Sequence, residues 1–201
     1  MIKPIKTFWN GRVFRSRLEA RWAVFYDALG IEYEYEKEGY HLPGELYYLP
    51  DFWLPEQGCW VEIKPVPPTP LEFDKAKLLA ANLGIPVYMA IGAIGMTRKW
   101  AEPGERLVDH IYGDNPPEHW AFFGADGNWE LDEGYLWTRC PSCGRFGIHF
   151  EGRANRLCGC EAGSGKEGRD ESRCESILIA YLAALTAQFD RPKQPSNSAA
   201  A

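Results

Sequence analysis

Two neighbouring stretches of the chain decide the fold: Leu49-Pro50-Asp51-Phe52-Trp53-Leu54-Pro55 and Cys59-Trp60-Val61-Glu62-Ile63-Lys64. Both are rich in aromatic and β-branched residues, which favour strands. Pro55-Glu56-Gln57-Gly58 separates them and is typical of a turn. We therefore expect one strand over 47–54 and a second over 59–66.

Three polar residues interrupt these apolar stretches. Asp51 follows Pro50, and Glu62 and Lys64 lie two residues apart, so that both point to one face of their strand while Ile63 points to the other. Each feature alone is commonly structural, because Pro-Asp suits turns and a Glu-x-Lys pattern suits a solvated strand face. Together, among Trp and Val, they are costly unless they share a site.

The chemistry that fits this set is hydrolysis of a phosphodiester. A divalent metal polarises a phosphoryl oxygen and lowers the pKa of the attacking water. Mg²⁺ takes one or two carboxylates and keeps several waters, which Asp51 and Glu62 can supply, with the carbonyl of Ile63 as a further ligand. Lys64 would orient the water and balance the charge on the phosphate.

The flanking sequence predicts the other elements of a mixed α/β sandwich, in the order helix, three strands, helix, strand. Helices are indicated by apolar residues at helical spacing between capping residues, and strands by alternation or by short apolar runs. We expect a hairpin over 7–14 around Asn10-Gly11, a helix from Ser16 to Gly30, a strand over 31–36 with Ile31, Tyr33 and Tyr35 buried, a helix over 71–83 with Leu71, Leu78 and Leu79 inward, and a strand over 85–91.

These residues resemble the PD-(D/E)XK nuclease superfamily. The matching motifs are Pro50-Asp51, ten intervening residues, then Glu62-Ile63-Lys64, and the helix start Ser16-Arg17-Leu18-Glu19-Ala20. The helix motif and the stretch 49–55 are similar to phage Holliday-junction resolving and transposon-end-cleaving endonucleases. The resemblance implies an αβββαβ restriction-endonuclease-like core over 1–95, a cut in DNA that depends on Mg²⁺ or Mn²⁺, and Glu19 as a third acid at the metal. Ser16-x-x-Glu19 is also a capping box, in which Glu19 would bond back to the Ser16 backbone.

A second metal site is indicated over 136–162. Cys140 and Cys143 form a C-x₂-C pair, and Cys158 and Cys160 follow as C-x-C after fourteen intervening residues. Four thiolates suit a structural zinc ion, and a hairpin made by 146–151 and the residues leading to Cys158 would complete a zinc ribbon. An iron–sulfur cluster and four unrelated buried cysteines are the alternatives.

The rest of the chain divides by composition. We expect an irregular connecting region over 96–135 with short strands at 119–123 and 128–131, and a C-terminal amphipathic helix within 170–190. That helix would pack on the core or build a dimer. The tail 191–201 is rich in Pro, Ser and Ala and predicts disorder.

Charge and targeting signals limit the partners. The formal net charge is −6, which argues mildly against a nucleic-acid partner, but basic residues cluster locally. The candidate contacts to nucleic acid are Arg12, Arg15, Arg17, Lys75, Arg139 and Arg145. The absence of an apolar run of about eighteen residues argues against a membrane span, and no secretory signal precedes residue 7, so we expect a cytoplasmic protein of a bacterial or phage-infected cell.

The residues therefore predict a metal-dependent endonuclease, and the resemblance implies that its substrate is DNA. It would act as a homodimer if it makes paired cuts. The zinc ribbon would aid substrate binding or stability. The alternative is a catalytically silent protein of the same fold that binds nucleic acid or protein through the ribbon.

Overall fold

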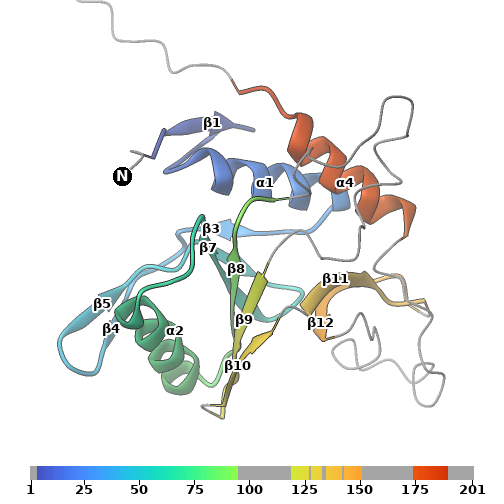
Figure 1. Cartoon of the computed structure of the whole chain (residues 1–201). Coiled ribbons are helices and arrows are strands. Elements are labelled where there is room, and N and C mark those ends of the chain that lie inside the picture. The colour runs from blue at the N-terminus through green and yellow to red at the C-terminus, as the bar shows by residue number, and fades with distance from the viewer. Residues whose placement is uncertain are drawn as a thin grey trace, which may run out of the picture.

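The computed structural model describes residues 4–94, 119–126, 128–132, 135–141, 143–150 and 174–189. Within these ranges the largest sheet has six strands, with helices on both of its faces (Figure 1). The strand order is β10 (Trp129–Asp132), β9 (His119–Phe123), β8 (Val87–Ile91), β7 (Cys59–Lys64), β6 (Phe52–Leu54) and β3 (Glu34–Tyr35). β7 and β8 are parallel, and the other neighbours are antiparallel. The expected mixed α/β class is confirmed.

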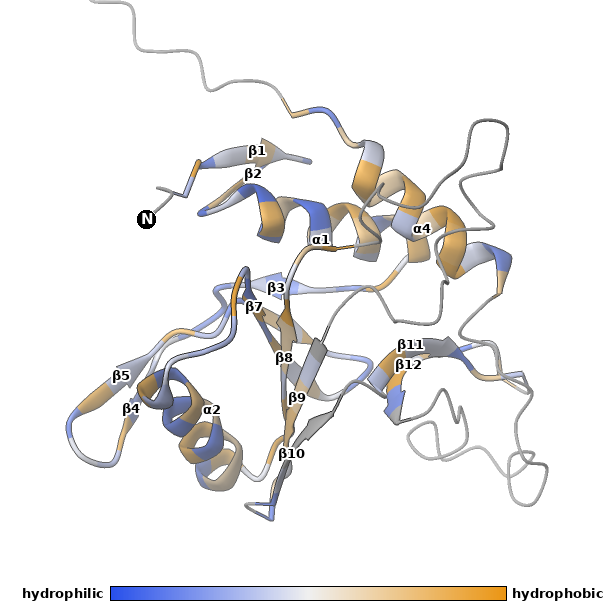
Figure 2. Cartoon of the chain, in the orientation of Figure 1, coloured by the Kyte–Doolittle hydropathy of each residue, from blue (hydrophilic) through white to orange (hydrophobic). Residues whose placement is uncertain are grey.

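The sheet separates two hydrophobic cores. On one face α1 (Arg17–Leu29) and α4 (Glu175–Thr186) pack together and against alternate strand residues such as Val61 and Ile63. On the other face α2 (Pro70–Leu83) covers Trp60, Met89 and their neighbours. β7 and β8 are therefore buried on both sides, as a parallel pair requires, and Figure 2 shows β8 and α4 mostly in hydrophobic colours.

Two hairpins flank this sandwich. β1 (Thr7–Trp9) and β2 (Arg12–Phe14) pair beside α1, and Asn10 and Gly11 both have positive φ angles at their turn, as a type I′ turn requires. β4 (Tyr40–Leu42) and β5 (Leu46–Tyr48) form the second hairpin, which packs against α2. No helix among the described residues is long and apolar enough to cross a bilayer.

The predicted helix ends are confirmed. Ser16 is the N-cap of α1, with its hydroxyl accepting from the Glu19 N–H at 3.2 Å, and Gly30 ends the helix at φ 67°. α2 begins after Thr69 and ends at Gly84. The predicted inward position of Leu71 is wrong, because it is 52% exposed in the first turn, and the buried side of α2 consists of Ala76, Leu79 and Ala80.

Two predicted strands are shorter than expected. Of 31–36 only β3 pairs, although Ile31 is buried and the residues alternate in exposure. The stretch 47–54 is broken: β5 pairs with β4, and β6 joins the main sheet. Pro50 has no N–H and so cannot donate a hydrogen bond to a neighbouring strand. After it the chain joins the main sheet, where the Asp51 carbonyl accepts from the Glu36 N–H at 2.8 Å. The break leaves Asp51 at the start of β6, at the edge of a cavity.

The C-terminal part adds a small hairpin and a helix. β12 (Phe146–Phe150) pairs with β11 (Tyr135–Arg139), which lies upstream of the first cysteine pair, whereas we expected a partner leading to Cys158. The short strands expected near 119–123 and 128–131 are confirmed as β9 and β10. α4 confirms the C-terminal helix, and it packs on α1 rather than standing free. The predicted tail, most of the connecting region and the second cysteine pair lie outside the described residues.

Candidate functional site

Asp51 and Glu62 are locked to each other at the start of β6 and near the end of β7. The Asp51 N–H donates to Glu62 Oε2 at 3.2 Å, and the Ile63 N–H donates to Asp51 Oδ2 at 2.8 Å. Both carboxylates are buried, at 2% and 4% exposure. Two acids that are eleven residues apart in sequence are thus held side by side by backbone hydrogen bonds.

Lys64 joins these acids to α2. Its Nζ lies 2.9 Å from Glu62 Oε1 and 2.7 Å from Glu72 Oε1. Burial alone would lower the pKa of Lys64, but the two carboxylates outweigh it and raise that pKa above its ordinary value. Lys64 is therefore a fixed cation beside the buried pair. Glu72 also completes the capping box of α2 with Thr69, a Thr-x-x-Glu signature that was readable in the sequence.

Glu19 reaches the same place from α1. Its Oε1 accepts from the Ser16 hydroxyl at 2.6 Å, and its Oε2 accepts from the Arg15 N–H at 3.1 Å and from the Tyr35 hydroxyl. The capping-box expectation is therefore corrected in one respect: the side chain bonds back to the backbone of Arg15 and not of Ser16. The extra bond from Tyr35 turns Glu19 toward the sheet.

Arg15 forms a bridge between acids from different elements. Its Nη2 lies 2.5 Å from Asp51 Oδ1, and its Nε lies 2.6 Å from Glu36 Oε1. The Arg15 side chain is 50% exposed, whereas that of Asp51 is 3% exposed. Arg15 is thus a solvent-facing cation whose head is held at the buried acids.

These groups share a cavity of about 510 Å³. Residues from α1, β5, β7 and α2 line it, and the predicted candidates among them are Arg15, Glu19, Asp51, Glu62, Ile63, Lys64 and Lys75. The exposed ring of Tyr47 belongs to its wall, where the Lys75 Nζ donates to the Tyr47 carbonyl at 2.8 Å. The four predicted catalytic residues are therefore brought together, with two predicted cationic contacts beside them.

The electrostatics of the cavity favour a bound cation. Burial, followed by repulsion from Glu62 and Glu19, raises the pKa of Asp51 well above its ordinary value. Burial also raises the pKa of Glu62, although Lys64 opposes the shift. Clustered oxygen donors with excess negative charge are the ligands that Mg²⁺ and Mn²⁺ prefer, so the donor set fits such an ion.

The side chains are nevertheless not yet arranged around a metal. Among the described residues, no group of three or more His, Cys, Asp or Glu side chains has an arrangement that could hold a metal ion. The contacts give the physical reason, because Arg15 engages Asp51, Lys64 engages Glu62, and Tyr35 engages Glu19. Two of these partners are cations that neutralise the acids from within the chain.

Tyr48 is a site residue that sequence reasoning missed. It lies on β5, is 8% exposed and lines the cavity, and its hydroxyl is buried without a hydrogen-bond partner. Burial, then the charges of Glu62 and Asp51, raises the pKa of Tyr48 well above its ordinary value, so the hydroxyl stays a proton donor. A lone Tyr in a short alternating strand carries no sequence signal for this role.

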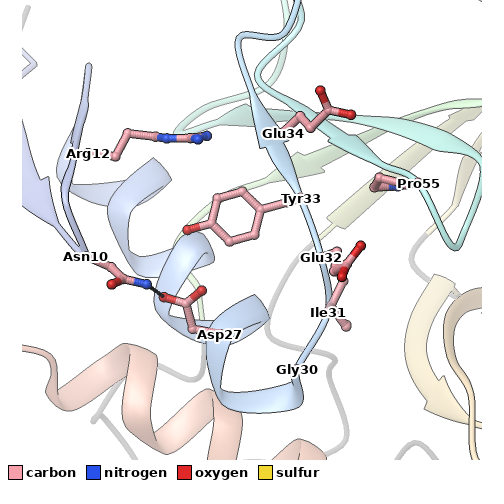
Figure 3. A pocket seen from close by; sticks show the side chains of 9 residues that line it. All are labelled: Asn10, Arg12, Asp27, Gly30, Ile31, Glu32, Tyr33, Glu34 and Pro55. Atoms are coloured by element: carbon pink, nitrogen blue, oxygen red, sulfur yellow. Dashed lines mark hydrogen bonds between the residues drawn. The ribbon is translucent and has the colours of Figure 1, made fainter.

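A larger cavity of about 680 Å³ lies between the β1–β2 turn and the C-terminal end of α1 (Figure 3). Arg12 lies here, 5.8 Å from the centroid of the Tyr33 ring, and not in the cavity of the buried acids. Asp27 accepts from the Trp9 indole at 2.7 Å and from Asn10 at 3.3 Å, so this acid ties the hairpin to the helix. The polar contacts in the larger cavity therefore have a structural explanation, whereas the buried acids line the smaller one. The remaining basic candidate of this region, Arg17, is exposed in the first turn of α1.

Cys140 and Cys143 lie in the turn between β11 and β12. The Cys140 N–H donates to the Arg145 carbonyl at 2.8 Å, and the Gly144 N–H donates to the Cys140 carbonyl at 2.9 Å, which folds the turn around the buried Cys140 and the exposed Cys143. Both cysteines therefore lie in one turn at the tip of a hairpin, which is the place that half of a four-thiolate site requires. Cys158 and Cys160 lie outside the described residues.

This hairpin is attached far from the buried acids. Arg145 Nε lies 3.3 Å from Glu56 Oε1, and the Gln57 amide donates to the Phe146 carbonyl at 3.0 Å. Glu56 and Gln57 form the turn between β6 and β7, at the opposite end of these strands from Asp51. At about 3.3 Å per residue, the length of β7 places Arg145 on the order of 15–20 Å from Lys64. The exposed Arg139 lies at the end of β11, on the same hairpin.

No family model, curated protein or solved structure matches this chain. What the site can do therefore follows from its own groups. The site brings together two buried carboxylates, a third acid nearby, a lysine held by two carboxylates, and two further basic side chains at the cavity.

Proposed function

We propose that the chain is a metal-dependent DNA endonuclease of the PD-(D/E)XK type, with an αβββαβ core and a zinc-ribbon accessory. The observation that carries the proposal is that Glu62 Oε2 accepts from the Asp51 N–H and Asp51 Oδ2 accepts from the Ile63 N–H, with Lys64 2.9 Å from Glu62, at the wall of an open cavity. A structural ion pair would not need two acids buried against each other, because their repulsion opposes folding.

The roles of the residues follow from their contacts. Asp51, Glu62 and the Ile63 carbonyl would hold Mg²⁺ or Mn²⁺, with Glu19 as a further acid. When bound, the ion supplies a Lewis acid for the phosphoryl oxygen and lowers the pKa of a water. Lys64, kept protonated by two carboxylates, orients the attacking water and stabilises the negative charge that grows on the phosphate.

DNA is the proposed substrate because of the resemblance of the motifs, and the basic rim agrees with a phosphate backbone. Arg15 and Lys75 lie at the cavity, whereas Arg139 and Arg145 lie on the β11–β12 hairpin, at the far end of β7. The two basic regions are therefore suited to contact phosphates that are separated along one nucleic acid, and not the same phosphate.

The proposed zinc ion would be held by Cys140, Cys143, Cys158 and Cys160. Its role is to fix the β11–β12 hairpin, which packs on the main core through Trp137 and Ile148. The described residues of the hairpin tip, within 140–145, do not belong to that core, so a metal would supply order there.

The deciding experiment is cleavage of single-stranded, duplex and branched oligonucleotides in Mg²⁺ or Mn²⁺. Wild type is compared with Asp51→Ala and Lys64→Ala, and Asp74→Ala on the exposed side of α2 and Lys37→Ala on the surface are the matched controls. The proposal requires cutting by wild type and by both controls, and loss of cutting in the two site variants with unchanged circular dichroism. Equal cutting by all five proteins would show that the Asp51 and Lys64 site is not the source of the cleavage, and the catalytic proposal would fail.

A catalytically silent binding protein is the second candidate. The observation in its favour is that Arg15 and Lys64 already neutralise the acids without any metal. Binding of one of these DNAs by wild type, with no cleavage in either metal and no Mn²⁺ binding at Asp51, would favour it.

A further inference from the structure

Arg15 occupies the place where a metal ion would need its ligand. Asp51 Oδ2 is taken by the Ile63 N–H, which leaves Oδ1 as the oxygen that can face an ion, and the Arg15 Nη2 lies 2.5 Å from it. A guanidinium and a divalent cation cannot occupy the same side of one oxygen. We infer that Arg15 is an internal counter-ion that the metal displaces from Asp51, and that the released guanidinium then binds a phosphate of the nucleic acid. This inference rests on the proposed function.

The structure explains why Arg15 and not Lys64 is the exchangeable cation. The Arg15 side chain is 50% exposed, whereas that of Lys64 is 17% exposed and has two carboxylate partners. Glu36, the other partner of Arg15, is also partly exposed to solvent, with 26% of its side-chain surface accessible. Moving Lys64 would leave Glu62 and Glu72 without their cation. When Arg15 moves, the incoming metal ion replaces it as the cation beside Asp51.

Only the end of the Arg15 side chain has to move. Its backbone N–H donates to Glu19 Oε2 at 3.1 Å and to the Tyr35 hydroxyl oxygen at 3.0 Å, which fixes the main chain at the cavity wall. The Nε contact to Glu36 at 2.6 Å can keep the guanidinium at the mouth of the cavity. There its planar donors match two phosphate oxygens better than a lysine could.

The exchange couples two binding events. Without metal, Arg15 is engaged by Asp51 and contributes little to phosphate binding. With metal bound, Asp51 no longer needs it, so metal should raise the affinity for DNA, and DNA should raise the affinity for metal by the same factor.

The first test is calorimetric titration of Mn²⁺ into the full chain without DNA. Arg15→Gln removes the competing cation, so we expect Mn²⁺ to bind about tenfold more tightly, the factor for loss of one charge-assisted contact. Lys37→Gln, which removes an exposed cation one residue from Glu36, is the matched control and should bind Mn²⁺ as wild type does. Thermal unfolding without metal should show a lower midpoint for Arg15→Gln and a larger rise on adding Mn²⁺, because its buried acids have lost a counter-ion.

The second test measures the coupling. Binding of a short fluorescent oligonucleotide is followed by anisotropy with and without Ca²⁺, and the strand is checked for intactness on a gel. Wild type and Lys37→Gln should both gain affinity with Ca²⁺ by the same factor, and Arg15→Gln should lose most of that gain. Arg15→Lys, which keeps the charge without the planar fork, should fall between them and replaces the Gln variant if that protein does not fold.

The outcomes separate this inference from the proposed function. Mn²⁺ binding by wild type that Asp51→Asn abolishes, together with unchanged Mn²⁺ affinity in Arg15→Gln, overturns the exchange and leaves the nuclease proposal standing. No Mn²⁺ binding by wild type or by Arg15→Gln overturns both.

Discussion

Replacing Tyr48 by Phe should raise the free energy of unfolding and reduce the rate of DNA cleavage. Tyr48 packs its ring in the core under α2, and its hydroxyl is buried without a hydrogen-bond partner. Phe keeps the ring and removes only the oxygen. Burial of an unpaired hydroxyl costs about 1–3 kcal/mol in protein mutational data, so the free energy of unfolding should rise by about that amount.

For a chain of this length the gain corresponds to a rise of roughly 2–12 °C in the midpoint of thermal unfolding. Differential scanning calorimetry without metal measures it, and urea unfolding gives the free energy independently. Tyr40→Phe is the matched control: Tyr40 faces Tyr48 in the β4–β5 register, but its hydroxyl donates to Glu38 at 2.6 Å. That variant should be unchanged or slightly less stable.

The same substitution should reduce cleavage, because the Tyr48 hydroxyl is a proton donor that lies beside Glu62 in a residue lining the cavity. A fall in kcat with increased stability is the expected combination. If Tyr48→Phe instead lowers the midpoint, the hydroxyl has a protein partner in solution, for which the neighbouring Glu62 is the candidate. The argument that the hydroxyl is unpaired until substrate binds then fails.

Three further predictions address the acids, the zinc ion and a cap. Because burial and Glu62 raise the pKa of Asp51 above its ordinary value of 3.8, this group favours folding below that value and loses its contribution as the pH rises through the folded-state pKa. Asp51→Asn should therefore raise the metal-free thermal midpoint at about pH 8 more than at about pH 5. It should also remove the rise in midpoint that Mn²⁺ produces. An equal effect at both pH values would contradict a raised pKa of Asp51 as the cause. Purified protein should contain one zinc by mass spectrometry of the metal, and Cys140→Ser should lower that content, whereas Cys59→Ser, at a buried thiol on β7, should keep it. Thr69→Ala removes the capping box of α2 and should cost about 1 kcal/mol in urea unfolding, and Thr69→Ser should restore most of it.

Local signals were sufficient for the elements that carry the acids. Caps at Ser16 and Gly30 delimit α1, and the apolar run around Glu62 is by itself enough to indicate β7. The ten residues between Asp51 and Glu62, in two strands joined by a short turn, were enough to expect these two acids at one place. These features depend on residues close in sequence, for which capping and alternation are direct physical consequences of the backbone.

Other features depend on contacts between distant segments and could not be predicted. β9 pairs with β8 across a long intervening segment, and no residue pattern in either strand predicts this pairing. The exposed guanidinium of Arg15 reaches Asp51 because of how α1 lies on the sheet, so its sequence position suggested only a contact to phosphate. The break at Pro50, by contrast, was readable, because proline cannot take part in a continuous ladder.

The antiparallel pairing of β6 and β7 has a consequence for the length of the turn between them. Phe52 faces Val61 and Leu54 faces Cys59, so continuing the same register places Asp51 opposite Glu62. A single residue added to or removed from the turn 55–58 without a compensating bulge would shift this pairing by one position. Glu62 would then point into the core under α1, and Val61 after an insertion, or Ile63 after a deletion, would take its place opposite Asp51. The ten residues between Asp51 and Glu62 thus set which face of β7 carries Glu62. The fold should tolerate a two-residue change in the turn far better than a change of one, because a shift of two keeps each β7 side chain on its own face.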